Sequence, residues 1–222
     1  MAETGTDAPK LRERAYAAFT NRLLAREIVP GQFVSQRELV EITGLPLGAI
    51  RELVPRLEAE GLIVTIPQRG MQVAHVDLSL IRNAFQFRLM MEREAVEVFV
   101  REAPDAEIER LLEAHERIIK DAKKKITPDV IRRAQLADWD MHDTIVDFLG
   151  NEIVSSAYRV NSIKIRLIRQ AEVRLDPSRV ETGMRAHMGL VRRMAARGIG
   201  GARNAVGAQI QDAKTRAMGL SP

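Results

Sequence analysis

Apolar residues recur at helical spacing along most of the chain. Over residues 105–124, for example, an apolar stripe repeats every three or four positions while the intervening positions are mostly charged, as in an amphipathic helix that packs on one side. Proline, asparagine and glycine interrupt the pattern and end the segments. The sequence therefore predicts a mainly α-helical protein, with helices over about residues 11–27, 36–43, 47–61, 78–103, 105–124, 128–149, 152–172, 178–197 and 201–218.

One stretch, Glu60–Val73, departs from this helical pattern. Its sequence, EGLIVTIPQRGMQV, contains two short β-branched segments around a PQRG turn, where Gly70 is free to take a positive φ. Because an isolated hairpin is only marginally stable in water, it must pack on the helices that precede it. The stretch is therefore predicted to be a hairpin that completes the N-terminal domain.

The two helices before this hairpin are short and are joined by a turn that contains Gly44. Ser35 and Glu38 have the spacing of a capping box at the start of the first helix. Two short helices joined in this way form the helix-turn-helix pattern, and a hairpin directly after them is a wing. The sequence thus predicts a winged helix-turn-helix domain over residues 1–76 and an all-helical bundle over residues 77–222.

Composition limits the classes of function. The chain has no cysteine, which excludes disulfides and thiolate metal sites, and it has no apolar run long enough to span a membrane, so a cytoplasmic protein is expected. Its net charge is +4, but residues 1–76 contain nine basic and nine acidic residues. If this domain binds nucleic acid, individually placed arginines must do so, since it has no general positive field.

The stretch VPGQFVSQRELVEITGLPLGAIRELVPRLEAEGLIVTIPQRGMQV resembles the winged helix-turn-helix of GntR-type bacterial transcription regulators. The resemblance implies a homodimer that binds an inverted repeat in a double-stranded DNA operator. Pro46-Leu47-Gly48 stands where the family commonly has a Ser-Arg-Thr-like triplet, so one base-reading arginine is missing. Pro55 lies within the recognition helix, where proline is expected to cause a kink. The residues that the resemblance assigns to DNA are Arg37, Leu47, Gly48, Arg51, Gln68, Arg69 and Gly70.

Several polar residues lie on the core-facing stripes of the second domain. Asp138 and His142 fall within the apolar sector of their helix, where a carboxylate is costly unless a charge, a metal or a donor meets it. One helical turn apart, the two side chains can hold one ion together. His115, in contrast, is expected to be a packed core histidine. The other inward-facing polar residues, which together predict a polar cavity, are Arg88, Asn161, Arg169, His187 and Gln209.

This second region resembles the FCD domain of FadR-like regulators, through DWDMH with Asn151, through Arg88 and Glu92 of RLMME, and through His187. In metal-binding members, one aspartate and three histidines hold a divalent ion such as zinc. Asp138, His142 and His187 match three of these positions, while Gln209 occupies the fourth, so either a weaker metal site or none follows.

The resemblance also implies a small anionic effector, plausibly a carboxylate, bound in this helical domain. The predicted effector contacts are Arg88, Asn161, Arg169 and Gln209. Three readings remain: a metabolite-controlled regulator with a metal, the same class of regulator with a purely structural polar core, and a metal-dependent hydrolase. Because the sequence contains no recognised catalytic motif, a regulator that is not an enzyme is expected.

Overall fold

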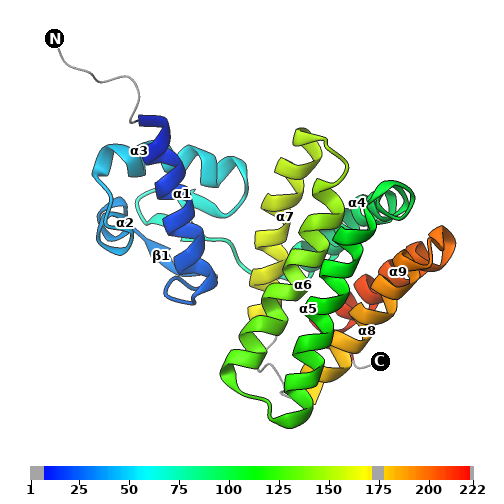
Figure 1. Cartoon of the computed structure of the whole chain (residues 1–222). Coiled ribbons are helices and arrows are strands. Elements are labelled where there is room, and N and C mark those ends of the chain that lie inside the picture. The colour runs from blue at the N-terminus through cyan, green and yellow to red at the C-terminus, as the bar shows by residue number, and fades with distance from the viewer. Residues whose placement is uncertain (1–7, 172–177, 221–222) are drawn as a thin grey trace. The chain divides into compact units, whose positions relative to one another are not determined.

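The computed structural model describes residues 8–171 and 178–220, and it is mainly helical as predicted (Figure 1). Packing divides these residues into two compact units. One contains the described residues up to Leu80 together with Ile163–Ala171, and the other contains Ile81–Ser162 and the described residues from Ser178 onward. The helices of the described chain are α1 Ala8–Leu24, α2 Gln36–Thr43, α3 Leu47–Ala59, α4 Leu78–Glu102, α5 Asp105–Lys124, α6 Pro128–Asp147, α7 Glu152–Ala171, α8 Ser178–Ala195 and α9 Ile199–Ala217.

The first unit combines α1, α2 and α3 with a small antiparallel sheet. The predicted hairpin is formed by β2 (Ile63–Ile66) and β3 (Gly70–Val73), which pair from Ile63 opposite Val73 to Ile66 opposite Gly70. A third strand, β1 (Phe33–Val34), pairs with β3, so the strand order is β1-β3-β2. Sequence reasoning missed β1 because two residues are too short to show an alternating pattern.

Local signals in the sequence set the ends of these elements. Ser35 caps α2, and its backbone N–H donates to Glu38 at 2.6 Å, which completes the predicted capping box. Gly44 ends α2 in the left-handed region with a φ of 70°, and Gly70 takes a φ of 94° in the hairpin. Helix α3 continues past Pro55 to Ala59. Short-range sequence signals therefore determine where α2 begins and ends and where the hairpin turns.

The hydrophobic core of the first unit lies against the buried face of α3. Ile50, Leu53 and Leu57 are completely buried on one face of this helix, as the helical periodicity predicts. Leu62, directly before β2, and Val73, the last residue of β3, are also completely buried in the same cluster. The hairpin therefore packs on the helices before it.

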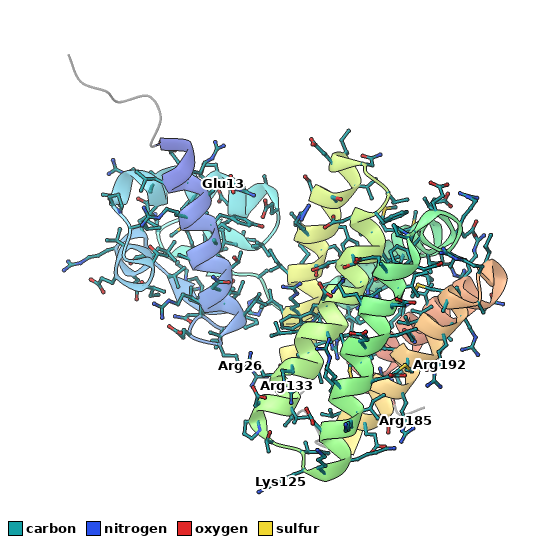
Figure 2. All side chains as sticks on the ribbon, viewed as in Figure 1. Glu13, Arg26, Lys125, Arg133, Arg185 and Arg192 are labelled. Carbon is teal, nitrogen blue, oxygen red and sulfur yellow. The ribbon has the colours of Figure 1, made fainter. Side chains whose placement is uncertain are left out.

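The second unit contains α4 from Ile81 onward, the helices α5, α6, α8 and α9, and the first part of α7. Helix α5 packs against both α6 and α8, and α8 also packs against α9 (Figure 1). Charged side chains such as Arg133, Arg185 and Arg192 project outward from these helices (Figure 2). Among the described residues, no helix is long and apolar enough to cross a bilayer.

Candidate functional sites

The first candidate site is the exposed face of α3, opposite its buried stripe. Arg51 is exposed there, together with Leu47 and Gly48 at the start of the helix. Arg37, on α2, has a side chain that is 90% exposed and lies 3.4 Å from the Glu41 carboxylate. Such a weak surface ion pair leaves a guanidinium available for another anion at little cost.

The second part of this surface is the tip of the hairpin, where Gln68, Arg69 and Gly70 are all exposed. Gln68 has a φ of 62° and Gly70 has a φ of 94°, so two residues of the PQRG turn take left-handed backbone conformations. A Cβ on Gly70 would lie 3.3 Å from the Val34 carbonyl oxygen, which adds a steric reason for glycine to its positive φ.

The Arg69 guanidinium lies over the ring of Phe33, 4.8 Å from the ring centroid. Phe33 belongs to β1 and is 37% exposed. This cation–π contact restrains a long, mobile side chain at the hairpin tip. Sequence reasoning missed Phe33, because only the pairing of β1 with β3 brings it to Arg69.

The other candidate site is a buried cluster in the second unit. Asp138 and His142 lie one turn apart on α6, and His187 reaches them from α8. The Nε2 atoms of His187 and His142 lie 3.1 Å and 3.4 Å from the same oxygen, Oδ1 of Asp138. Each residue offers one ligand atom, and these atoms all lie within 4.8 Å of one another. Three residues predicted as metal ligands are thus brought together from two helices.

Glu92, on α4, connects this cluster to a wider polar network. Its side chain is completely buried and accepts three hydrogen bonds: from Arg88 Nε at 2.5 Å, from His142 Nδ1 at 2.6 Å and from the Tyr158 hydroxyl at 2.6 Å. Both carboxylate oxygens therefore have donors. A buried carboxylate is stable only with such partners, and here three different helices supply them.

The charges in this network set its protonation. Burial by itself would raise the pKa of Glu92, but the Arg88 charge and the hydrogen bonds from His142 and Tyr158 hold that pKa at about 2. Glu92 is therefore ionised and can only accept, so His142 must carry a proton on Nδ1. Burial and Arg88 would lower the pKa of His142, but the carboxylates of Glu92 and Asp138 raise it above its usual value.

The donor atoms of the cluster suit a divalent metal. Two imidazole nitrogens and one carboxylate oxygen are typical zinc ligands. The hydrogen bond from His142 Nδ1 to Glu92 orients the ring so that Nε2 faces Asp138, and metal-bound histidines usually have a partner of this kind. Residues of the cluster therefore fit such an ion, and its supporting carboxylate is already in place.

The predicted effector residues have different surroundings. Arg88 is 7% exposed and paired with Glu92, while Asn161 donates to the Ala84 carbonyl at 3.0 Å. Gln209 donates to the carbonyl of Ala186, the residue before His187, at 2.7 Å. Arg169 belongs to Ile163–Ala171, the part of α7 that groups with the first unit, and its role as an effector contact stays a prediction.

Comparison of the sequence with models of known protein families identifies two families. Residues 11–73 match the family model described as bacterial regulatory proteins of the gntR family, and residues 83–212, more than half of the chain, match that of the FCD domain. The chain belongs to the gntR family and carries an FCD domain. Both families consist of transcription regulators rather than enzymes, which confirms the expectation that this GntR-family regulator is not an enzyme.

Individual relatives agree with this assignment. The regulator is 26% identical to the HTH-type transcriptional regulator YdhC of Bacillus subtilis over 161 residues, which cover 71% of this chain and 69% of YdhC. In fold it is similar to McbR/YncC of E. coli, with a TM-score of 0.74, 17% identity and coverage of 91% of this chain and 94% of that one. A GntR transcriptional regulator from Rhodococcus sp. RHA1 gives a TM-score of 0.75 at 15% identity, covering 95% of this chain and 99% of that one.

Sequence reasoning about the regulator also left gaps in its polar network. Glu92 is indicated only by the family resemblance, and sequence reasoning missed Tyr158, whose hydroxyl donates a hydrogen bond to Glu92. A buried Glu four residues after a buried Arg is a signal for an internal ion pair. No comparable signal marks Tyr158, because its partner lies 66 residues away.

Proposed function

We propose that this regulator binds operator DNA as a homodimer and is controlled by a small carboxylate that binds beside a divalent metal in its FCD domain. The exposed face of α3 and the hairpin tip contact the DNA, while Asp138, His142 and His187 hold the metal. The observation that carries the metal part of this proposal is the meeting of two histidine nitrogens at one oxygen of a buried aspartate.

The DNA part rests on a few exposed arginines. Residues 1–76 have equal numbers of acidic and basic residues, so attraction to phosphates alone is weak. Arg51 on the recognition helix and Arg69 at the hairpin tip are both exposed and can reach DNA bases or phosphates. In the proposed dimer, two such surfaces bind two half-sites whose spacing follows the spacing of the two domains.

The proposed class of effector follows from the net charge of the metal-loaded cluster. Arg88 and Glu92 neutralise each other, and Asp138 leaves one negative charge in the cluster. A divalent cation beside neutral histidines more than compensates this charge, so the loaded site has a net positive charge. Because a buried positive site attracts an anion strongly, a small carboxylate is the class of ligand that fits. Arg88, Asn161 and Gln209 are the proposed contacts within this unit. The carboxylate acts by favouring one placement of the two DNA-binding domains.

A second candidate is the same regulator without a metal. The position of His142 favours it, because an imidazole that donates from Nδ1 to Glu92 and from Nε2 toward Asp138 satisfies both carboxylates without an ion. The polar cluster would then be a structural network, and the effector would bind Arg88 directly.

The test combines three measurements on the full-length protein. Selection of operator fragments from genomic DNA at moderate salt tests the DNA part, and the absence of any preference over random duplex would reject it. Metal analysis of the purified protein and of His142→Ala separates the two candidates. A thermal-shift screen of small organic acids, with and without chelator, tests the effector: a shift that chelator abolishes supports the metal-dependent form, and a shift that chelator leaves unchanged supports the metal-free form.

A further inference from the structure

The proposed metal centre has three ligands, whereas closed zinc sites in proteins have four. Two buried polar atoms that find no hydrogen-bond partner among the described residues lie on the helices that pack against α8. One is Nε2 of His115 on α5, and the other is Oε1 of Gln209 on α9. Because an unsatisfied buried polar atom costs free energy, each of these two atoms points to a missing partner.

His115 is completely buried beside the cluster, and its ring nitrogens lie outside the group of ligand atoms that are all within 4.8 Å of one another, so binding the ion requires its ring to move closer. Its ring meets the ring of His187 edge to face, with 5.7 Å between the centroids. The ring of His187 meets that of His142 in the same way, also with 5.7 Å between the centroids. Three imidazole rings from three helices therefore lie in a row in space, with the ring of His187 between those of His115 and His142.

The hydrogen bond of His115 fixes its tautomer. Nδ1 lies 2.7 Å from the carbonyl oxygen of Leu111, one turn earlier in α5. A carbonyl can only accept, so Nδ1 carries the proton and Nε2 of the neutral ring presents a lone pair. Metal-bound histidines usually have this arrangement, with one ring nitrogen donating to a carbonyl or carboxylate and the other binding the ion.

We infer that His115 is the fourth protein ligand of the metal, through Nε2. This inference rests on the proposed metal centre formed by Asp138, His142 and His187. An imidazole nitrogen binds zinc better than the neutral amide oxygen of Gln209, whose amide group is already held by the Ala186 carbonyl. The third histidine of the site is thus supplied by α5 rather than by α9, where this sequence has glutamine.

The experiment compares the full-length wild type with His115→Gln, Gln209→Ala and the matched control His75→Gln, which changes a histidine of the other unit. The chain has four histidines and no cysteine, so His75 is the one histidine outside the proposed centre. Zn²⁺ affinity is measured by competition with a chromophoric chelator, and the visible absorption of the Co²⁺ form reports the number and type of ligands. His115→Gln is expected to weaken Zn²⁺ binding at least about 10-fold and to change the Co²⁺ spectrum, whereas His75→Gln stays within about 2-fold of wild type and Gln209→Ala loses less affinity than His115→Gln.

Wild-type affinity and an unchanged Co²⁺ spectrum in His115→Gln would overturn the inference and leave the three-residue centre intact. A loss of Zn²⁺ affinity in Gln209→Ala, with wild-type affinity in His115→Gln, would assign the fourth ligand position to Gln209 and overturn the inference as well. A wild type that binds no divalent ion would reject the metal centre itself, and the inference with it.

A measurement on the wild type alone covers the case in which His115→Gln does not fold. In protein labelled with ¹⁵N-histidine, Zn²⁺ is expected to shift the Nε2 resonances of three imidazoles, and a shift of only two would overturn the role of His115.

Discussion

Glu92 and His142 are separated by 50 residues in the sequence, and yet the Glu92 carboxylate accepts a hydrogen bond from His142 Nδ1 at 2.6 Å. This contact joins α4 to α6 inside the FCD domain. It also links the Arg88–Glu92 ion pair to the histidine cluster, since Glu92 bonds to both Arg88 and His142. Stability and the proposed metal binding therefore depend on the same carboxylate.

Glu92→Gln is expected to weaken both properties. The neutral amide leaves Arg88 buried without its countercharge, and breaking a buried ion pair in this way costs about 3–5 kcal/mol of unfolding free energy. Loss of the carboxylate behind His142 should also reduce Zn²⁺ affinity about 10–100-fold. Denaturant unfolding and chelator competition measure the two effects, with Glu94→Gln, an exposed position on the same helix, as the control. Equal stability of the two variants would contradict the role given to Glu92.

Arg51→Ala is expected to weaken binding to the selected operator by about 1–3 kcal/mol and to relax sequence preference, because a side chain on the recognition helix that reads a base contributes about this much. Binding to random duplex should change far less. Arg14→Ala removes the same charge from an exposed site on α1 and serves as the control. Unchanged operator affinity, measured by fluorescence anisotropy at fixed salt, would exclude Arg51 from base reading.

Phe33→Ala is expected to weaken operator binding about 2–5-fold although phenylalanine carries no charge, because an exposed cation–π contact is worth about 0.5–1 kcal/mol. The reason is that Arg69 loses the surface that restrains it. A double-mutant cycle with Arg69→Ala measures this dependence directly. If the losses of the two single variants simply add, Phe33 does not act through Arg69.

Both tyrosines of the chain should resist ionisation at alkaline pH. Burial raises the pKa of Tyr16 and of Tyr158 above the ordinary value of about 10. Each hydroxyl also donates a hydrogen bond to a carboxylate, Glu60 for Tyr16 and Glu92 for Tyr158, and these negative charges raise the pKa further. Because the folded state favours the neutral phenol, this stabilisation is complete below about pH 10 and is lost as the pH rises above it.

Ultraviolet absorbance is therefore expected to show tyrosinate only together with alkaline unfolding, followed in parallel by circular dichroism. Protein in denaturant, where both phenols titrate near pH 10, is the control, and Tyr158→Phe leaves Tyr16 as the single reporter. A folded protein that ionises either phenol near pH 10 would contradict the two hydrogen bonds.

The sequence predicted the helices and the hairpin closely, because their signals are local. The predicted helix over 105–124 and α5 coincide, and α2 begins and ends as its capping box and Gly44 indicated. Helical periodicity also placed Asp138 and His142 on a buried face, and both are almost completely buried. The strand β1 was missed because its two residues gain their structure only from pairing with β3.

What the sequence by itself determined about this regulator is therefore the type and extent of its elements, the face that each helix buries, and its family. The tertiary structure alone decided which inward-facing polar residues meet: that Glu92 supports His142, that Phe33 restrains Arg69, and that the ring of His115 adjoins that of His187. The physical reason is the range of the interactions. Helix periodicity, caps and turns act over a few residues, whereas these contacts depend on how helices and strands that are distant in the sequence pack against one another.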